Sequence, residues 1–313
     1  MKRFFYAAGL LLLLVFMLCF PSEALNAARE GMNLWLNTLI PTLLPFIILT
    51  ELLIGTGVVE SLLKPLQKFW KKVFGISPAG AYALILGLLC GYPMGAKITS
   101  DLYTHHKIRK KEAEYLLTFT SYASPGFLYT YLIHICLNDA VHPAYVFCIL
   151  ILSGFFTMLF FRFVIFRNQL SVSGAPVKQE KKESSAPGFT GTLLDASIMN
   201  GFETITRLGG YILLFSILSA LFRCCWKGGK ITGHLLLGAL ELTTGLHYLA
   251  DSGLPMTVRF LCSISLTAFG GICILAQTKS LLNRELSVLP YFSAKCLHAA
   301  ITAVISLIFI QIV

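Results

Sequence analysis

Long apolar segments alternate with short basic loops along this chain, a pattern that is typical of proteins crossing a membrane several times. Windows without Asp, Glu, Lys or Arg cover residues 32–50, 79–96, 115–138, 140–161, 260–278 and 296–313. Several of them reach about 20 residues, the length that an α-helix needs to span the hydrocarbon core. The pattern therefore predicts an all-α polytopic membrane protein.

One apolar segment, residues 77–100, carries Gly87, Gly91, Pro93 and Gly95 within nine positions. A smooth helix is not expected there, because proline removes a backbone donor and each interior glycine costs roughly 1 kcal/mol relative to alanine. Both flanking loops are basic, so a simple crossing would leave one of them outside, against the positive-inside rule. We therefore predict a re-entrant helical hairpin that enters and leaves on the cytoplasmic side, with residues 91–95 at its tip.

The second half of the chain repeats this order with the opposite orientation. Residues 231–252 form a short segment broken around residues 241–245, which predicts a second hairpin from the other side. Crossings are interrupted at residues 124–126 in the first half and 270–271 in the second. Together these features predict an inverted repeat with two re-entrant hairpins and interrupted transmembrane helices, an arrangement that places a ligand site near the membrane midplane.

The predicted organisation has four regions. Residues 1–24 form a transmembrane helix, which we favour over a cleaved secretory signal, and residues 25–167 form the first unit with an additional crossing. Residues 168–192 are a polar cytoplasmic linker, and residues 193–313 form the second unit with a C-terminal transmembrane helix. Glu51, near the end of the second crossing, is expected at the membrane interface.

Composition narrows the possible functions. The chain is 56% hydrophobic and only 13% charged, against about 25% charged in a typical soluble domain, and no large soluble domain remains. The net charge of +10 lies in loops beside apolar segments and does not indicate nucleic-acid binding. We interpret the nine cysteines as small, buried, apolar side chains. Cys224 and Cys225 are unusual because they are adjacent in the sequence. Motifs for nucleotide hydrolysis, esterase or zinc-protease chemistry are missing, so we expect neither an enzyme, nor a metal site, nor a cofactor.

Several stretches resemble membrane proteins built from nucleoside-recognition Gate domains, and within them the sporulation integral membrane protein family known as YlbJ or SpoVV. The matching stretches are residues 31–57, 91–101 (GYPMGAKITSD), 119–127 (FTSYASPGF), 240–245 (LELTTG) and 269–277 (FGGICILAQ). The resemblance implies a fold related to one scaffold of concentrative nucleoside transporters. For the sporulation branch it also implies passage of dipicolinate across the outer forespore membrane.

The candidate solute contacts are polar, ionisable or backbone-exposing residues at the predicted breaks. They are Gly91, Tyr92, Pro93, Gly95, Lys97, Ser121, Ser124, Glu241, Thr243, Thr244, Gly245 and Gln277. The candidate gating hinges are Pro125, Gly126, Gly270 and Gly271.

Each candidate side chain has more than one interpretation. Lys97 either recognises a solute carboxylate or extends to the cytoplasmic interface as an ordinary topology charge. Glu241 is either a coupling group for a proton or cation, a partner for a base at the substrate site, or a boundary residue in water. The hydroxyl candidates either donate to a ligand or bond their own helix backbone.

The favoured function is a secondary transporter or facilitated exporter of a small polar solute, anionic and aromatic, with a possible coupling ion. The alternatives are a nucleoside-type transporter and a non-transporting membrane scaffold of a sporulation complex. The expected partners are the solute and the lipid bilayer, and the sequence does not indicate an oligomeric state.

Overall fold

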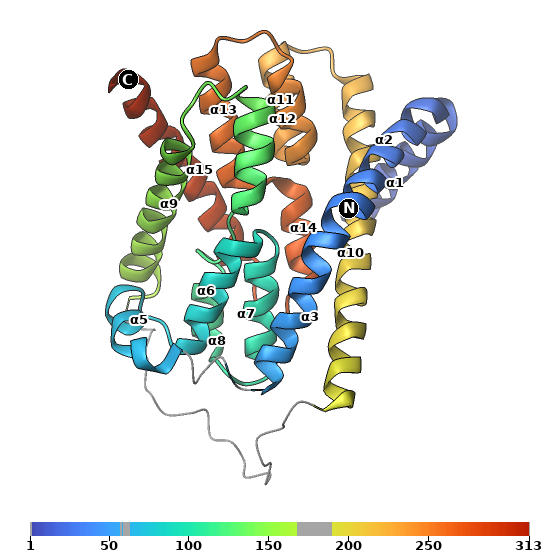
Figure 1. Cartoon of the computed structure of the whole chain (residues 1–313). Helices are drawn as coiled ribbons and strands as arrows, with labels where there is room; N and C mark the ends of the chain where they lie inside the picture. Colours follow the sequence, from blue (N-terminus) through green and yellow to red (C-terminus); the bar gives the residue numbers. More distant parts are fainter. Residues whose placement is uncertain (1, 57, 59–62, 168–189, 313) are drawn as a thin grey trace.

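A computed structural model describes residues 2–56, 58, 63–167 and 190–312 of the chain (Figure 1). Most of the predicted linker at 168–192 therefore lies outside the described residues. Within them the protein is helical and has no strand, as the apolar pattern predicted. Five helices in this part are long and apolar enough to span a membrane: Pro21–Thr56, Pro143–Ile165, Gly191–Cys225, Met256–Leu281 and Leu289–Gln311.

The first half begins with α1 (Lys2–Cys19) and a long helix composed of α2 (Pro21–Leu34), η1 (Trp35–Leu39) and α3 (Ile40–Thr56). A short 3-10 turn, η2 (Lys64–Leu66), and α5 (Gln67–Val73) then lead at a bend of 79° into the first hairpin. Further along the chain, α9 (Pro143–Phe160) and η4 (Phe161–Ile165) form the additional crossing.

The first hairpin consists of α6 (Pro78–Cys90) and α7 (Met94–Thr104), which pack against each other. Ser77 caps the start of α6 by accepting a hydrogen bond from the Gly80 amide. The helix ends because Gly91 has a φ of +84°, a conformation that residues with a Cβ rarely adopt. The predicted break is confirmed, although it ends at Pro93 and leaves Gly95 inside α7.

The second hairpin consists of α11 (Lys230–Leu240) and α12 (Leu242–Ala250), broken at Glu241. In Figure 1 the two hairpins lie at opposite ends of the molecule, and their tips approach each other in the middle. This opposed arrangement agrees with the predicted inverted repeat. The sides from which the hairpins enter a membrane stay a prediction.

Both predicted interruptions are present. The helix α8 (Lys110–Leu116) ends well before Pro125, where the next helical segment begins and continues as η3 (Phe127–Cys136). In the second half Gly270, with a φ of +86°, separates α13 (Met256–Phe269) from α14 (Gly271–Leu281). The broken crossings therefore follow the glycine and proline positions of the sequence.

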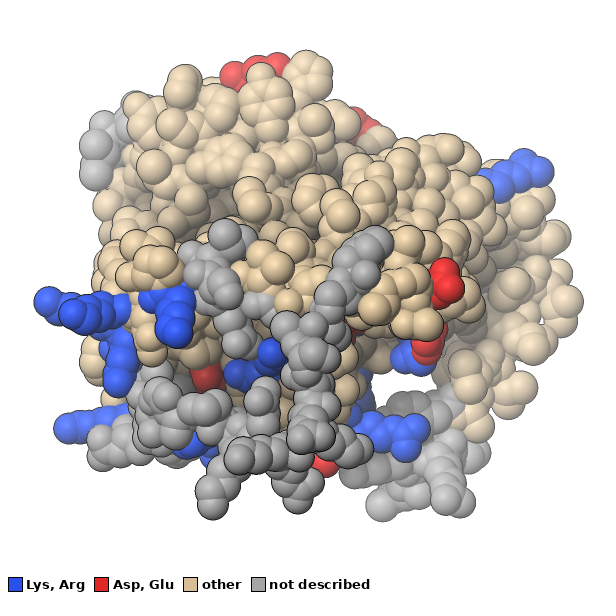
Figure 2. Space-filling view, turned by 60° about the horizontal axis from the view of Figure 1, so that its bottom comes forward, with Lys and Arg blue, Asp and Glu red and all other residues tan. Residues whose placement is uncertain are grey.

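Two long helices enclose these broken elements. The 35-residue α10 (Gly191–Cys225) packs along α2 and α3, and α15 (Leu289–Ile312) packs along α9 and α13. At 1.5 Å per residue α10 is about 52 Å long, well beyond the roughly 30 Å hydrocarbon core. Figure 2 shows lysine and arginine side chains gathered in the lower part of the view, toward the end of the molecule that lies at the bottom of Figure 1, a clustering that the positive-inside rule predicts for a cytoplasmic face.

A candidate solute site between the hairpin tips

A cavity of about 620 Å³ lies where the two hairpin tips meet. Residues 91–93 of the first hairpin and 241–243 of the second both line it. Its size falls in the range of about 300–1,000 Å³ that is usual for small-molecule sites. The two breaks that the sequence singled out therefore face one shared space.

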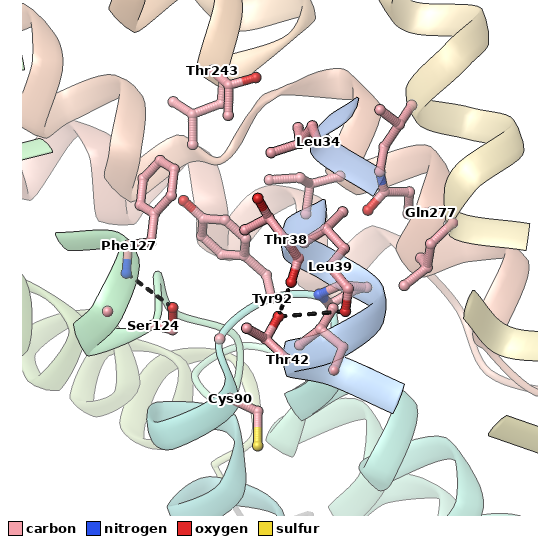
Figure 3. A pocket seen from close by; sticks show the side chains of 18 of the residues that line it. Leu34, Thr38, Leu39, Thr42, Cys90, Tyr92, Ser124, Phe127, Thr243 and Gln277 are labelled. Atoms are coloured by element: carbon pink, nitrogen blue, oxygen red, sulfur yellow. Dashed lines mark hydrogen bonds between the residues drawn. The ribbon is translucent and has the colours of Figure 1, made fainter. Parts of the chain in front are cut away.

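The rest of the lining is largely aliphatic, with leucine and isoleucine side chains from α2, α6 and α10 among others, and it also includes aromatic, hydroxyl and amide groups from η1, α3, η3 and α14. Figure 3 shows Thr38, Tyr92 and Gln277 approaching the cavity from different elements. The rings of Phe127 and Tyr131 stack with centroids 5.3 Å apart, and the Tyr131 hydroxyl donates to the Thr243 carbonyl at 2.8 Å. The cavity thus offers flat apolar surfaces together with a few hydrogen-bonding groups.

Helix N-termini lie close to this cavity because each break starts a new helix. The helix α7 begins after Pro93, a second after Ser124, α12 after Glu241, and α14 after Gly270. Unpaired N–H groups and the helix dipole give such ends a partial positive charge of about +0.5. At α12 this charge is already compensated by the Glu241 carboxylate, which accepts from the Thr243 and Thr244 amides. The other helix ends would stabilise a negatively charged solute without a basic side chain.

Glu241 is the one carboxylate among the described residues lining the cavity, and it caps α12. Its oxygens accept hydrogen bonds from the Thr243 amide at 3.2 Å and the Thr244 amide at 2.7 Å. The Thr243 hydroxyl donates to the same carboxylate at 2.7 and 2.8 Å. The negative charge is thus largely compensated by its own helix, and a coupling role for Glu241 stays a prediction.

Removal of this cap should weaken the second hairpin. We expect Glu241→Ala to lower the free energy of unfolding by about 1 kcal/mol, because the first α12 amides lose their acceptor. Glu241→Gln keeps one side-chain oxygen as an acceptor, so it should lower the free energy of unfolding by less than Glu241→Ala does. Thermal unfolding of the detergent-solubilised variants measures both, and equal stability of Glu241→Ala and the native protein would contradict the capping role.

The structure brings about half of the predicted site residues to the cavity. These are Gly91, Tyr92, Pro93, Ser124, Gly126, Glu241, Thr243 and Gln277. The other predicted residues do not line it: Gly95, Lys97, Ser121, Thr244, Gly245, Pro125, Gly270 and Gly271.

Lys97 is buried away from the cavity in a cluster of charges. Its ammonium lies 2.6 and 2.7 Å from the two carboxylate oxygens of Asp101 and 3.3 Å from Glu51 Oε1. Asn200 donates to the same Glu51 oxygen from α10. Lys97 is only 5% exposed and Glu51 only 8%, so neither side chain extends into water, and their depth in the membrane stays a prediction.

Gly95 and Gly245 are packing residues in this structure. A Cβ atom on Gly95 would lie 1.8 Å from the Thr120 carbonyl oxygen, and one on Gly245 would lie 2.0 Å from the Gly238 Cα. Real Cβ atoms never come so close to backbone. These glycines let a broken crossing approach α7, and α11 approach α12.

A stripe of buried polar side chains along one face of α15 was not predicted from the sequence. Lys295, His298, Thr302 and Ser306 are all buried, and their spacing of three and four residues places them on one helix face. This spacing was the available signal, but the uncharged window begins just after Lys295, which makes the lysine look like a boundary charge.

The opposed hairpins, the broken crossings and the central cavity are features of an all-helical integral membrane protein with a small-molecule-sized space between its two hairpin tips. Residues 36–168, which include the first hairpin and the first broken crossing, match the Gate family, described as nucleoside recognition. Over 91% of its length the chain is 24% identical to the sporulation integral membrane protein YlbJ of Bacillus subtilis (strain 168), covering 77% of that protein. The resemblance seen in the sequence motifs is therefore confirmed. No solved structure matches the chain.

The described residues contain no group of three or more His, Cys, Asp or Glu side chains that could hold a metal ion. Cys224 and Cys225 are exposed at the end of α10 and form no disulfide.

Proposed function

We propose that this protein is a secondary transporter or facilitated exporter of a small, polar, anionic aromatic solute, with dipicolinate during sporulation as the first candidate. The observation that carries the proposal is the cavity enclosed by two opposed hairpin tips. In secondary transporters, broken helices of inverted repeats surround the substrate near the midplane. Similarity to a sporulation integral membrane protein supports a role in a membrane during sporulation. The solute and the place in the outer forespore membrane are what the family resemblance in the sequence implies.

The lining suits an aromatic anion. Tyr92, Phe127 and Tyr131 supply ring surfaces, and Gln277 supplies an amide donor. The described lining contains no lysine or arginine, so the carboxylate groups would be stabilised by helix N-termini other than that of α12, which Glu241 already caps. This recognition mode replaces the earlier expectation that Lys97 binds the solute charge.

A nucleoside is the second candidate solute. The same absence of basic side chains from the described lining, and the description of the matching family, favour an uncharged ring system. Uptake of radiolabelled uridine and of dipicolinate into liposomes holding the purified protein separates the two. The proposal predicts faster dipicolinate entry than in protein-free liposomes, whereas flux of neither solute would favour a non-transporting scaffold.

Gln277→Leu should lower dipicolinate flux about tenfold at subsaturating solute. The amide is buried in the cavity wall, and losing a hydrogen bond to a charged group costs about 1.5–3 kcal/mol. Gln311→Leu, at the exposed end of α15, is the matched control and should transport normally. Equal flux in both variants would remove Gln277 from the solute site.

A further inference from the structure

Lys295 is a buried cation that the proposed solute site does not use. Its side chain extends from α15 into the interior and is only 6% exposed. The ammonium donates to the carbonyl oxygen of Ser121 and lies 3.4 Å from the carbonyl oxygen of Ala268. These two carbonyls are 147 residues apart in the sequence and belong to different halves of the repeat.

Both carbonyls lie beside breaks: Ala268 at the end of α13, and Ser121 in the non-helical stretch 121–124 that separates α8 from the helical segment beginning at Pro125. Ala268 is in the last turn of α13, and Ser121 directly follows the turn in which the Thr120 amide bonds the Leu116 carbonyl. A helix C-terminus carries a partial charge of about −0.5 on its unpaired carbonyls. The end of α13 therefore compensates part of the positive charge of the ammonium, and the Ser121 carbonyl adds a hydrogen bond from the non-helical stretch.

The remaining surroundings of the ammonium are aromatic. It lies 5.3 Å from the ring centroid of Tyr92, and 5.9 Å from those of Tyr122 and Tyr291. Ring faces attract a cation at these distances. No carboxylate among the described residues forms an ion pair with Lys295. The compensation therefore comes from the breaks themselves and from the rings.

This arrangement resembles a cation site of a secondary transporter, with a lysine in place of the ion. In such carriers, unwound carbonyls and half-helix C-termini coordinate the coupling cation. We propose that the Lys295 ammonium is a built-in cation that holds the two broken crossings together, so that the solute moves without a coupling sodium ion. This inference rests on the proposed function and specifies its ion requirement.

Tyr92 connects this cation to the solute cavity. One part of its side chain lines the cavity, its ring lies next to the ammonium, and its hydroxyl donates to the Thr267 carbonyl in α13 at 3.3 Å. Lys295 is therefore a positioning residue, because it acts on the solute site through Tyr92 and the two breaks. A change at Lys295 should alter the relative position of both hairpin tips.

Stability measurements test the built-in cation without any transport assay. Lys295→Met keeps the side-chain volume but removes the charge, and we expect it to lower the melting temperature by about 5–10 °C. Lys279→Met, on an exposed position of α14, is the control and should change it by less than about 2 °C. Equal melting temperatures for Lys295→Met and the native protein would overturn the proposal.

Chemical rescue tests the position of the charge. A cavity of about 150 Å³ adjoins Lys295, so Lys295→Ala leaves room for a small amine. Propylammonium should raise the melting temperature of Lys295→Ala and leave Lys295→Met unchanged, because the methionine fills the space. Equal effects on the two variants would contradict a specific cation position between the breaks.

Ion replacement completes the test on the native protein, which needs no variant to fold. Dipicolinate flux into liposomes should be the same when sodium is replaced by N-methylglucamine, and sodium should not raise the melting temperature. Flux that requires sodium would overturn the built-in cation. No flux under either condition would reject the proposed transport, while the stability results would still decide whether Lys295 holds the breaks together.

Discussion

Lys97→Met should lower the free energy of unfolding by about 3–5 kcal/mol, the largest effect expected from a single side-chain charge in this protein. The Lys97 ammonium lies between the carboxylates of Asp101 and Glu51, and the three side chains are mostly buried. Removing the ammonium leaves two buried carboxylates close together without the lysine between them, and His105 Nε2 lies 4.0 Å from the other oxygen of the Glu51 carboxylate. Chemical or thermal unfolding in detergent measures the loss, and Lys110→Met, exposed at the start of α8, should change stability by less than about 0.5 kcal/mol.

A double variant separates packing from solute recognition at the same position. Lys97→Met combined with Asp101→Asn removes one unpaired carboxylate, so it should recover part of the lost stability through a coupling energy of about 1–3 kcal/mol. If Lys97 only stabilises the fold, flux should recover together with stability. Recovered stability with flux still abolished would instead support the original expectation that Lys97 recognises the solute.

Gly95→Ala should prevent normal folding or destabilise the protein by about 3 kcal/mol or more. The added Cβ would lie 1.8 Å from the Thr120 carbonyl oxygen, and backbone held by the surrounding helices cannot move away cheaply. Gly87 faces the same oxygen from α6 at the same distance, so Gly87→Ala should behave alike. The yield of monodisperse protein and its melting temperature in detergent report the effect.

The matched control is another helical glycine. A Cβ on Gly210 in α10 would meet no atom within 4 Å, so Gly210→Ala should be neutral or slightly stabilising, by up to about 1 kcal/mol. Normal folding of Gly95→Ala would show that α7 and the broken crossing are less closely packed than the structure indicates. A loss of flux with full stability would instead indicate that the Gly95 backbone contacts the solute.

Much of the architecture could be predicted from the residues because its signals are local. Gly91 and Gly270 adopt positive φ angles that other residues rarely adopt, so the breaks follow directly from glycine positions. Charge asymmetry between loops predicted opposed hairpins, and the cavity between residues 91–93 and 241–243 agrees with that topology. Sidedness in the membrane and the contacts of the solute stay predictions.

The roles of buried charges could not be predicted in the same way. Lysines near segment ends suggest membrane topology, and a sequence does not show whether such a side chain points to water or to a carboxylate. Glu51, the second partner of Lys97, is 46 positions away, and the pair forms only because α3 packs on α7. Lys295 similarly reaches two carbonyls that are distant in sequence from each other and from α15.

The sequence by itself determined an all-helical membrane protein, the positions of its breaks and the presence of two hairpins, because apolar length, glycine and proline act on the nearby backbone. Tertiary structure alone decided which breaks share a cavity, that Glu241 caps its own helix, and that Lys97 and Lys295 are buried at two different sites. Those outcomes depend on which helices pack together, and a buried charge is stable only where packing brings compensating groups within a few ångströms.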